Sequence, residues 1–140
     1  VFHNHFWNPI MFAWPPMTMG CLMHDDMGMF ADFPTSYHTD WQWWDILEYA
    51  KVMDLQDFPS GTVPFIQVID SFDSNRKLGI GFEASVSGGK LLVLAMDAEK
   101  DIDKRPAARQ LLRSIDKYVR GDGFAPREVV DIEELQSLYE

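Results

Sequence analysis

The chain has 140 residues, of which 46% are hydrophobic, and this is enough for one globular domain that buries roughly two-thirds of its unfolded surface. Its formal net charge of -10 repels phosphate backbones and anionic lipid surfaces, so we expect no nucleic acid and no membrane among its partners. The sequence contains no run of 18 apolar residues that could span a membrane, and its single cysteine, Cys21, excludes an internal disulfide.

Residues 1–17 are rich in aromatic side chains, and Pro9 and the Pro15-Pro16 pair prevent a continuous helix there. The pattern predicts an extended aromatic arm that carries Trp7 and Trp14. Because the chain starts inside this stretch without a methionine, we expect it to be a fragment of a longer protein. The short apolar segment 18–23 predicts a strand, followed by a loop and one turn of helix before Pro34.

The densest aromatic stretch, residues 33–45, holds three of the five tryptophans within four residues. Thr39 can cap free backbone N–H groups while Gln42 reaches back as a capping box, so we expect a helix at about 40–52. At roughly 100° per residue, Trp43 joins the apolar stripe that faces the core and Trp41 turns to the opposite side. Trp44 lies on the border between the two.

The second half of the chain reads as strands followed by helices. Residues 63–69 predict a strand that ends at Asp70, and 78–86 with 90–96 predict an antiparallel hairpin whose second strand is buried on both faces. A clean amphipathic helix begins near Pro106, and Gly121 and Gly123 are expected to stop it in left-handed conformations. In the acidic tail, 124–140, the spacing of Ile132, Leu135 and Leu138 predicts a short docking helix.

This order predicts a single domain with its core in residues 18–121. We expect an α/β fold with a mixed sheet of about four to five strands flanked by two main helices. A two-layer α+β domain is the alternative.

The aromatic stretch is the leading candidate for a binding surface. Sugar rings stack on Trp and Tyr while neighbouring polar side chains bind their hydroxyl groups, and small ligands are usually held in this way. A contact with a neighbouring domain would use the same residues. The candidates for contact with carbohydrate or a neighbouring domain are Trp41, Trp44, Tyr37, His38, Asp40, Trp7 and Trp14.

The residue patterns support a metal site, a nucleophilic cysteine or a pair of catalytic acids less well. The candidate metal ligands His3, His5, His24, Asp25, Asp26 and His38 include no histidine pair at the i, i+4 helical spacing of a zinc site, so we expect no metal and no cofactor. Cys21 lacks the second glycine and the immediate helix of a nucleophile elbow and is expected to be a buried thiol. Asp70 and Asp97 each end a predicted strand, and with Cys21 they define the alternative of a small α/β enzyme.

Five segments in order resemble the C-terminal accessory region of bacterial family-two glycoside hydrolases, the β-galactosidase-like enzymes often described as sugar-binding proteins. They are FWNP (6–9), TMGCL (18–22), ADFPTSYHTDWQWWD (31–45), GGKLLV (88–93) and RPAARQLL (105–112).

The resemblance implies that the catalytic carboxylates lie on a separate barrel domain, so no catalytic residue is carried over and that barrel is the expected partner. It also implies a periplasmic or extracellular location. The element order looks like an amidotransferase-like module, degenerate because Cys21 lacks the nucleophile's setting and Met27-Gly28 replaces a His-Pro pair. We therefore expect a non-catalytic accessory domain that supports interdomain packing and carbohydrate contact, with a structural oligomerisation module as a further alternative.

Overall fold

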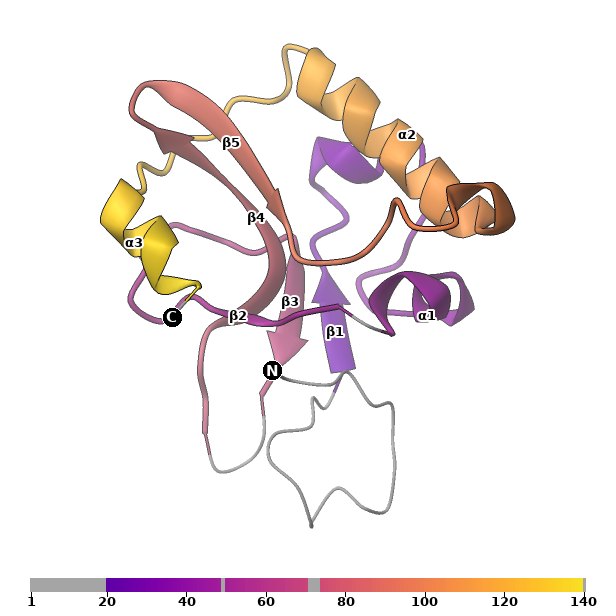
Figure 1. Ribbon diagram of the computed structural model, residues 1–140, viewed down its shortest axis with the longest axis horizontal. Coiled ribbons are helices and arrows are strands. Elements are labelled where there is room, and N and C mark those ends of the chain that lie inside the picture. The colour runs from indigo at the N-terminus through magenta and orange to yellow at the C-terminus, as the bar shows by residue number, and fades with distance from the viewer. Residues whose placement is uncertain (1–19, 49, 71–73, 140) are drawn as a thin grey trace.

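The computed structural model describes residues 20–48, 50–70 and 74–139, and there a five-stranded sheet is flanked by helices in a mixed α/β fold, as predicted (Figure 1). The strands are β1 (Gly20–Met23), β2 (Met53–Asp54), β3 (Ile66–Ile69), β4 (Leu78–Val86) and β5 (Gly89–Leu94). The helices are η2 (Gly28–Phe30), α1 (Trp41–Leu47), η3 (Ile102–Lys104), α2 (Pro106–Arg120) and α3 (Ile132–Ser137). The expected arm, 1–17, lies outside the described residues.

The long strand β4 is the centre of the sheet. Its first half pairs with β3, which in turn pairs with β1, while β2 and β5 also pair with β4. All pairs between these strands are antiparallel, which agrees with the α+β form of the prediction. The second half of β4 gains a further neighbour, because Ser85 forms a parallel bridge with Val129.

Because of a bulge in β4, the side chains of this one strand contribute to two different cores. Ile66 of β3 pairs with Gly81, but the next residue, Gln67, pairs with Gly79, so Ile80 is an extra residue on β4. Leu78, before the bulge, and Ile80, the extra residue itself, belong to the main core, and Phe82 and Ala84 after it belong to a second core. Glycine is required at 81 because a Cβ there would overlap the ring of Phe65.

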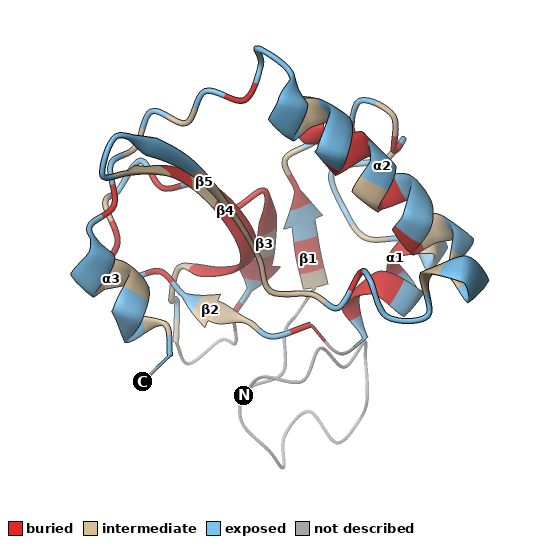
Figure 2. Cartoon of the chain, turned by 45° about the horizontal axis from the view of Figure 1, so that its top comes forward, coloured by how far each residue is buried: buried red, intermediate tan, exposed pale blue. Residues whose placement is uncertain are grey.

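The main core lies between the sheet and the buried faces of α1 and α2, which Figure 2 shows in red. Its largest fully buried side chains include Trp43, Phe65, Met29, Ile46, Leu47 and Leu111. The second core contains Leu55, Phe58, Phe82, Ala84 and Val130, and Leu135 and Leu138 pack against it. The predicted docking helix is therefore present as α3, with a capping box between Asp131 and Glu134, although Ile132 is exposed.

The tryptophan-rich helix begins within one residue of its expected start, but the expected capping box and the expected end are wrong. Its N-cap is Asp40, without a side-chain capping bond, and the amide of Gln42 instead donates to the carbonyl of Pro34 at 2.7 Å. Thr39 donates its backbone N–H to the carbonyl of Cys21, because this segment runs beside β1. The helix ends at Leu47 rather than near 52, since the chain must extend to form β2 beside β4.

Two further expectations are corrected. The hairpin strand that is buried most completely is β4, whereas β5 is exposed or intermediate along its length, because β4 has neighbours on both sides. Gly121 ends α2 with an extended backbone, φ -90°, and Gly123 also has no positive φ, so neither is a left-handed stop. The bond from the N–H of Gly121 to the carbonyl of Tyr118 closes the last turn instead.

Candidate functional site

Helix α1 separates its tryptophans by helical phase, as the sequence predicts. Trp43 is 0% exposed, and its ring makes edge-to-face contacts with Phe30 and Phe33, at centroid distances of 5.7 and 5.0 Å. Its indole Nε1–H donates to the hydroxyl of Thr35 at 2.8 Å, so the polar atom of this buried ring is satisfied. Trp43 is therefore a core anchor.

The opposite side of α1 is exposed. Trp41 is 91% exposed and Trp44 is 45% exposed, which confirms the outward position of the first and the border position of the second. With Asp45 and Glu48 they follow the i, i+3, i+4, i+7 spacing, so these four residues form one continuous exposed stripe. We call this set, Trp41, Trp44, Asp45 and Glu48, the exposed stripe.

The other predicted contact residues of this region precede the helix. Tyr37, His38 and Asp40 are all exposed, and the rings of Tyr37 and His38 lie 6.0 Å apart between centroids. All five predicted contact residues within the described part of the chain thus reach the surface, in the segment 37–44. Trp7 and Trp14 lie outside the described residues.

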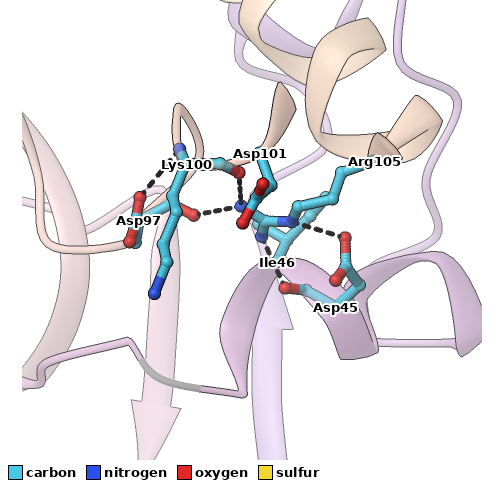
Figure 3. A pocket seen from close by; sticks show the side chains of 6 residues that line it. All are labelled: Asp45, Ile46, Asp97, Lys100, Asp101 and Arg105. Carbon is cyan, nitrogen blue, oxygen red and sulfur yellow. Dashed lines mark hydrogen bonds and ion pairs between the residues drawn. The ribbon is translucent and has the colours of Figure 1, made fainter. Parts of the chain in front are cut away.

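A pocket of about 290 Å³ lies beside the exposed stripe, between α1 and the segment 97–105 that joins β5 to α2 (Figure 3). We call it the linker pocket. Its lining residues are Asp45, Ile46, Asp97, Lys100, Asp101 and Arg105. Asp45 belongs to both the exposed stripe and the linker pocket.

Arg105 holds the two walls of the linker pocket together. Its Nε donates to Oδ2 of Asp45 at 2.8 Å and its Nη2 to the Asp45 carbonyl at 2.6 Å. Its Nη1 donates to the carbonyls of Asp97 and Lys100, at 2.7 and 3.0 Å. A guanidinium presents five N–H groups in a rigid fork, and four hydrogen bonds use most of them, so Arg105 fixes the position of Asp45.

The residues that line the linker pocket are three acids and two bases. Asp45, Asp97 and Asp101 supply three carboxylates, against two cations from Lys100 and Arg105. Lys104, which does not line the pocket, pairs with Asp101 at 3.3 Å and offsets this excess. In Figure 3 the ammonium of Lys100 extends away from the guanidinium, while the carboxylate of Asp45 meets it. The arrangement offers fixed hydrogen-bond acceptors and one ammonium donor, and an anionic ligand would meet the carboxylate of Asp45.

The three residues of the alternative enzyme hypothesis lie in different surroundings. Cys21 is buried in the main core, and Asp70 is a buried partner of Arg76, with a bidentate ion pair at 3.0 and 3.1 Å. The side-chain hydrogen bonding between Arg76 and Asp70 is the largest cause of the raised pKa of Arg76. Only Asp97 lines the linker pocket.

The described part of the chain contains no group of three or more His, Cys, Asp or Glu side chains placed to hold a metal ion. Nε2 of His24 lies 3.3 Å from the side-chain oxygen of Gln67, and His3 and His5 are not among the described residues. In the same ranges, no helix is both long and apolar enough to cross a membrane.

Sequence reasoning missed the linker pocket. The resemblance included Arg105 in a matching segment, but only the folded chain brings its guanidinium to Asp45, 60 residues away. Lys100 and Asp101 lie in a charged linker without any periodic pattern that would single them out.

Comparison with known proteins returns one family and no curated relative. No curated protein matches the chain. The family described as a domain of unknown function, DUF8487, matches residues 1–140, which is the whole chain. The chain therefore belongs to the DUF8487 family.

Proposed function

We propose that the chain is a non-catalytic accessory domain of a β-galactosidase-type glycoside hydrolase, and that the exposed stripe of α1 is its contact surface for carbohydrate. One observation carries the proposal: Trp41 is 91% exposed on a short helix that buries Trp43 completely. The resemblance of five ordered segments to the accessory region of such enzymes supports the choice of parent protein.

The exposure of Trp41 has a cost that a contact partner would offset. Burying a large apolar side chain contributes about 2 to 3 kcal/mol, and Trp41 forgoes nearly all of this in the isolated domain. For the stability of α1 alone, a Glu at this first helical position would serve better, because Glu is a stronger helix former than Trp and its charge suits the helix N-terminus. A ligand that covers the indole face recovers part of the forgone free energy.

The surroundings of Trp41 favour a saccharide over the core of a domain interface. Interface cores are depleted of charged residues, whereas the exposed stripe continues from Trp41 and Trp44 directly into Asp45 and Glu48. Aromatic faces with hydrogen-bond acceptors next to them suit a ring that has apolar C–H faces and polar edges. Packing against the catalytic barrel remains a role for other surfaces of the domain.

The test is a titration of the 140-residue chain with neutral β-galactosides and galactose-containing oligosaccharides, followed by calorimetry and tryptophan fluorescence. We expect saturable binding that Trp41→Ala abolishes. The matched control is Tyr139→Ala, because Tyr139 is 89% exposed and follows α3 at the other end of the molecule from α1 (Figure 1). Binding that is absent from the wild-type chain, or that Trp41→Ala leaves unchanged, would refute the carbohydrate role.

A further inference from the structure

We infer that the linker pocket is a subsite for one neutral sugar ring, next to a second ring stacked on the exposed stripe. The inference rests on the proposed function, which needs only the exposed stripe. It adds Lys100 and Asp101, which line the linker pocket together with Asp45, and the charge of the ligand.

The position of Asp45 connects the two parts of the site. Trp44 and Asp45 follow Trp41 by three and four residues, so both side chains neighbour that of Trp41 on the exposed stripe. Four residues, about 6 Å along the helix axis at 1.5 Å each, separate Trp41 from Asp45. The two rings of a disaccharide can span this step, with one ring on the indole and the other in the linker pocket.

The hydrogen-bonding groups of the linker pocket are held in place before any ligand arrives. Arg105 binds Oδ2 and the carbonyl of Asp45, and this leaves Oδ1 of the same carboxylate to accept a bond from a ligand. Asp97 accepts the backbone N–H of Lys100 at 3.1 Å, which fixes the turn that carries Lys100 and Asp101. Such preorganisation lowers the entropic cost of binding.

Charge and size select the class of ligand. Lys104 pairs with Asp101 at 3.3 Å from outside the lining, so the carboxylate most open to a ligand is that of Asp45. A carboxylate forms strong hydrogen bonds with sugar hydroxyl groups and repels the acidic groups of uronic acids and sulfated sugars. A volume of about 290 Å³ lies at the small end of the range for ligand pockets, which suits a single ring. We therefore expect neutral hexoses to bind and their acidic analogues to be rejected.

The experiment uses two variants of the linker pocket that preserve the fold. Lys100→Ala removes an exposed ammonium, and Asp101→Asn removes a charge while keeping a residue type that tolerates its left-handed backbone, φ 51°. The control is Asp103→Asn, an exposed acid of the same segment that does not line the pocket. Calorimetry measures the dissociation constants for a neutral β-galactoside disaccharide, for galactose and for galacturonic acid.

We expect the double variant Lys100→Ala/Asp101→Asn to raise the dissociation constant for the disaccharide by about tenfold, which corresponds to the loss of roughly one charge-assisted hydrogen bond. Asp103→Asn should leave this dissociation constant unchanged. Galactose should bind more weakly than the disaccharide, and galacturonic acid more weakly still. If Trp41→Ala abolishes binding while the double variant binds like the wild type, the subsite is refuted and the proposed function stands. If no neutral sugar binds the wild-type chain, both are refuted.

Discussion

Replacing Trp43 or Trp41, the two tryptophans of the W-x-W sequence in α1, with phenylalanine should change the stability by very different amounts. Trp43→Phe removes the Nε1–H that binds Thr35, worth about 1 kcal/mol, and leaves a space in the main core where part of the indole was. The lost apolar atoms add about 2 kcal/mol, so the free energy of unfolding should fall by about 3 kcal/mol. Trp41→Phe changes an exposed side chain and should cost less than about 0.5 kcal/mol.

The measurement is urea unfolding followed by far-UV circular dichroism, because tryptophan fluorescence changes with the substitutions themselves. With an m-value of about 2 kcal/mol/M, the loss for Trp43→Phe should move the midpoint down by about 1.5 M at an unchanged slope. Equal midpoints for the two variants would refute the burial of Trp43, and a large loss in Trp41→Phe would show that Trp41 packs within the domain.

Three further substitutions test the interactions that hold the sheet and the linker in place. Asp70→Asn should lower the free energy of unfolding by about 1 to 2 kcal/mol, measured by thermal unfolding. The loss stays small because the Arg76 side chain, 29% exposed, can regain water when its buried partner loses its charge. An unchanged Tm would show that the ion pair adds nothing to stability. Burial, and then the hydrogen bond to Glu83, raise the pKa of Tyr118 to about 12. The folded pKa therefore exceeds the unfolded value of about 10, so this contribution to stability is full below pH 10 and is lost as the pH rises towards 12. Tyr118→Phe should lose less stability over that window than the wild type, and parallel loss in both would contradict the assignment. Arg105→Lys should lower the free energy of unfolding by about 1 to 2 kcal/mol, because an ammonium cannot reproduce the four hydrogen bonds of the guanidinium. A variant that is as stable as the wild type in urea would contradict this role of Arg105.

Elements whose signals are local in the chain were predicted well. The apolar spacing of α2 and the turn residues between β4 and β5 depend on neighbours within a few positions, and both elements are present. The turn has Ser87 and Gly88 at φ 49° and 80°, which suits a tight two-residue hairpin connection. Helical phase likewise separated Trp41 from Trp43, because a rotation of about 100° per residue holds in any α-helix.

Elements that depend on distant partners were missed or misplaced. Strand β2 is two residues long and exists only because β4 offers an edge to pair with, so no periodic pattern marks it. The same pairing ends α1 early. The capping box expected at Thr39 was displaced because the backbone there pairs with β1, and this long-range bond outweighed a local preference.

The candidate site also has one part that local signals predict and one part that depends on distant residues. Its aromatic half lies within a single helix, so the sequence alone determined which indole faces outward. Its polar half brings Asp45 together with Arg105 from 60 residues further along the chain, and only the packing of α1 against α2 sets that distance. Neither residue carries a local sign of this contact, because a salt bridge between segments far apart in sequence has no period to detect.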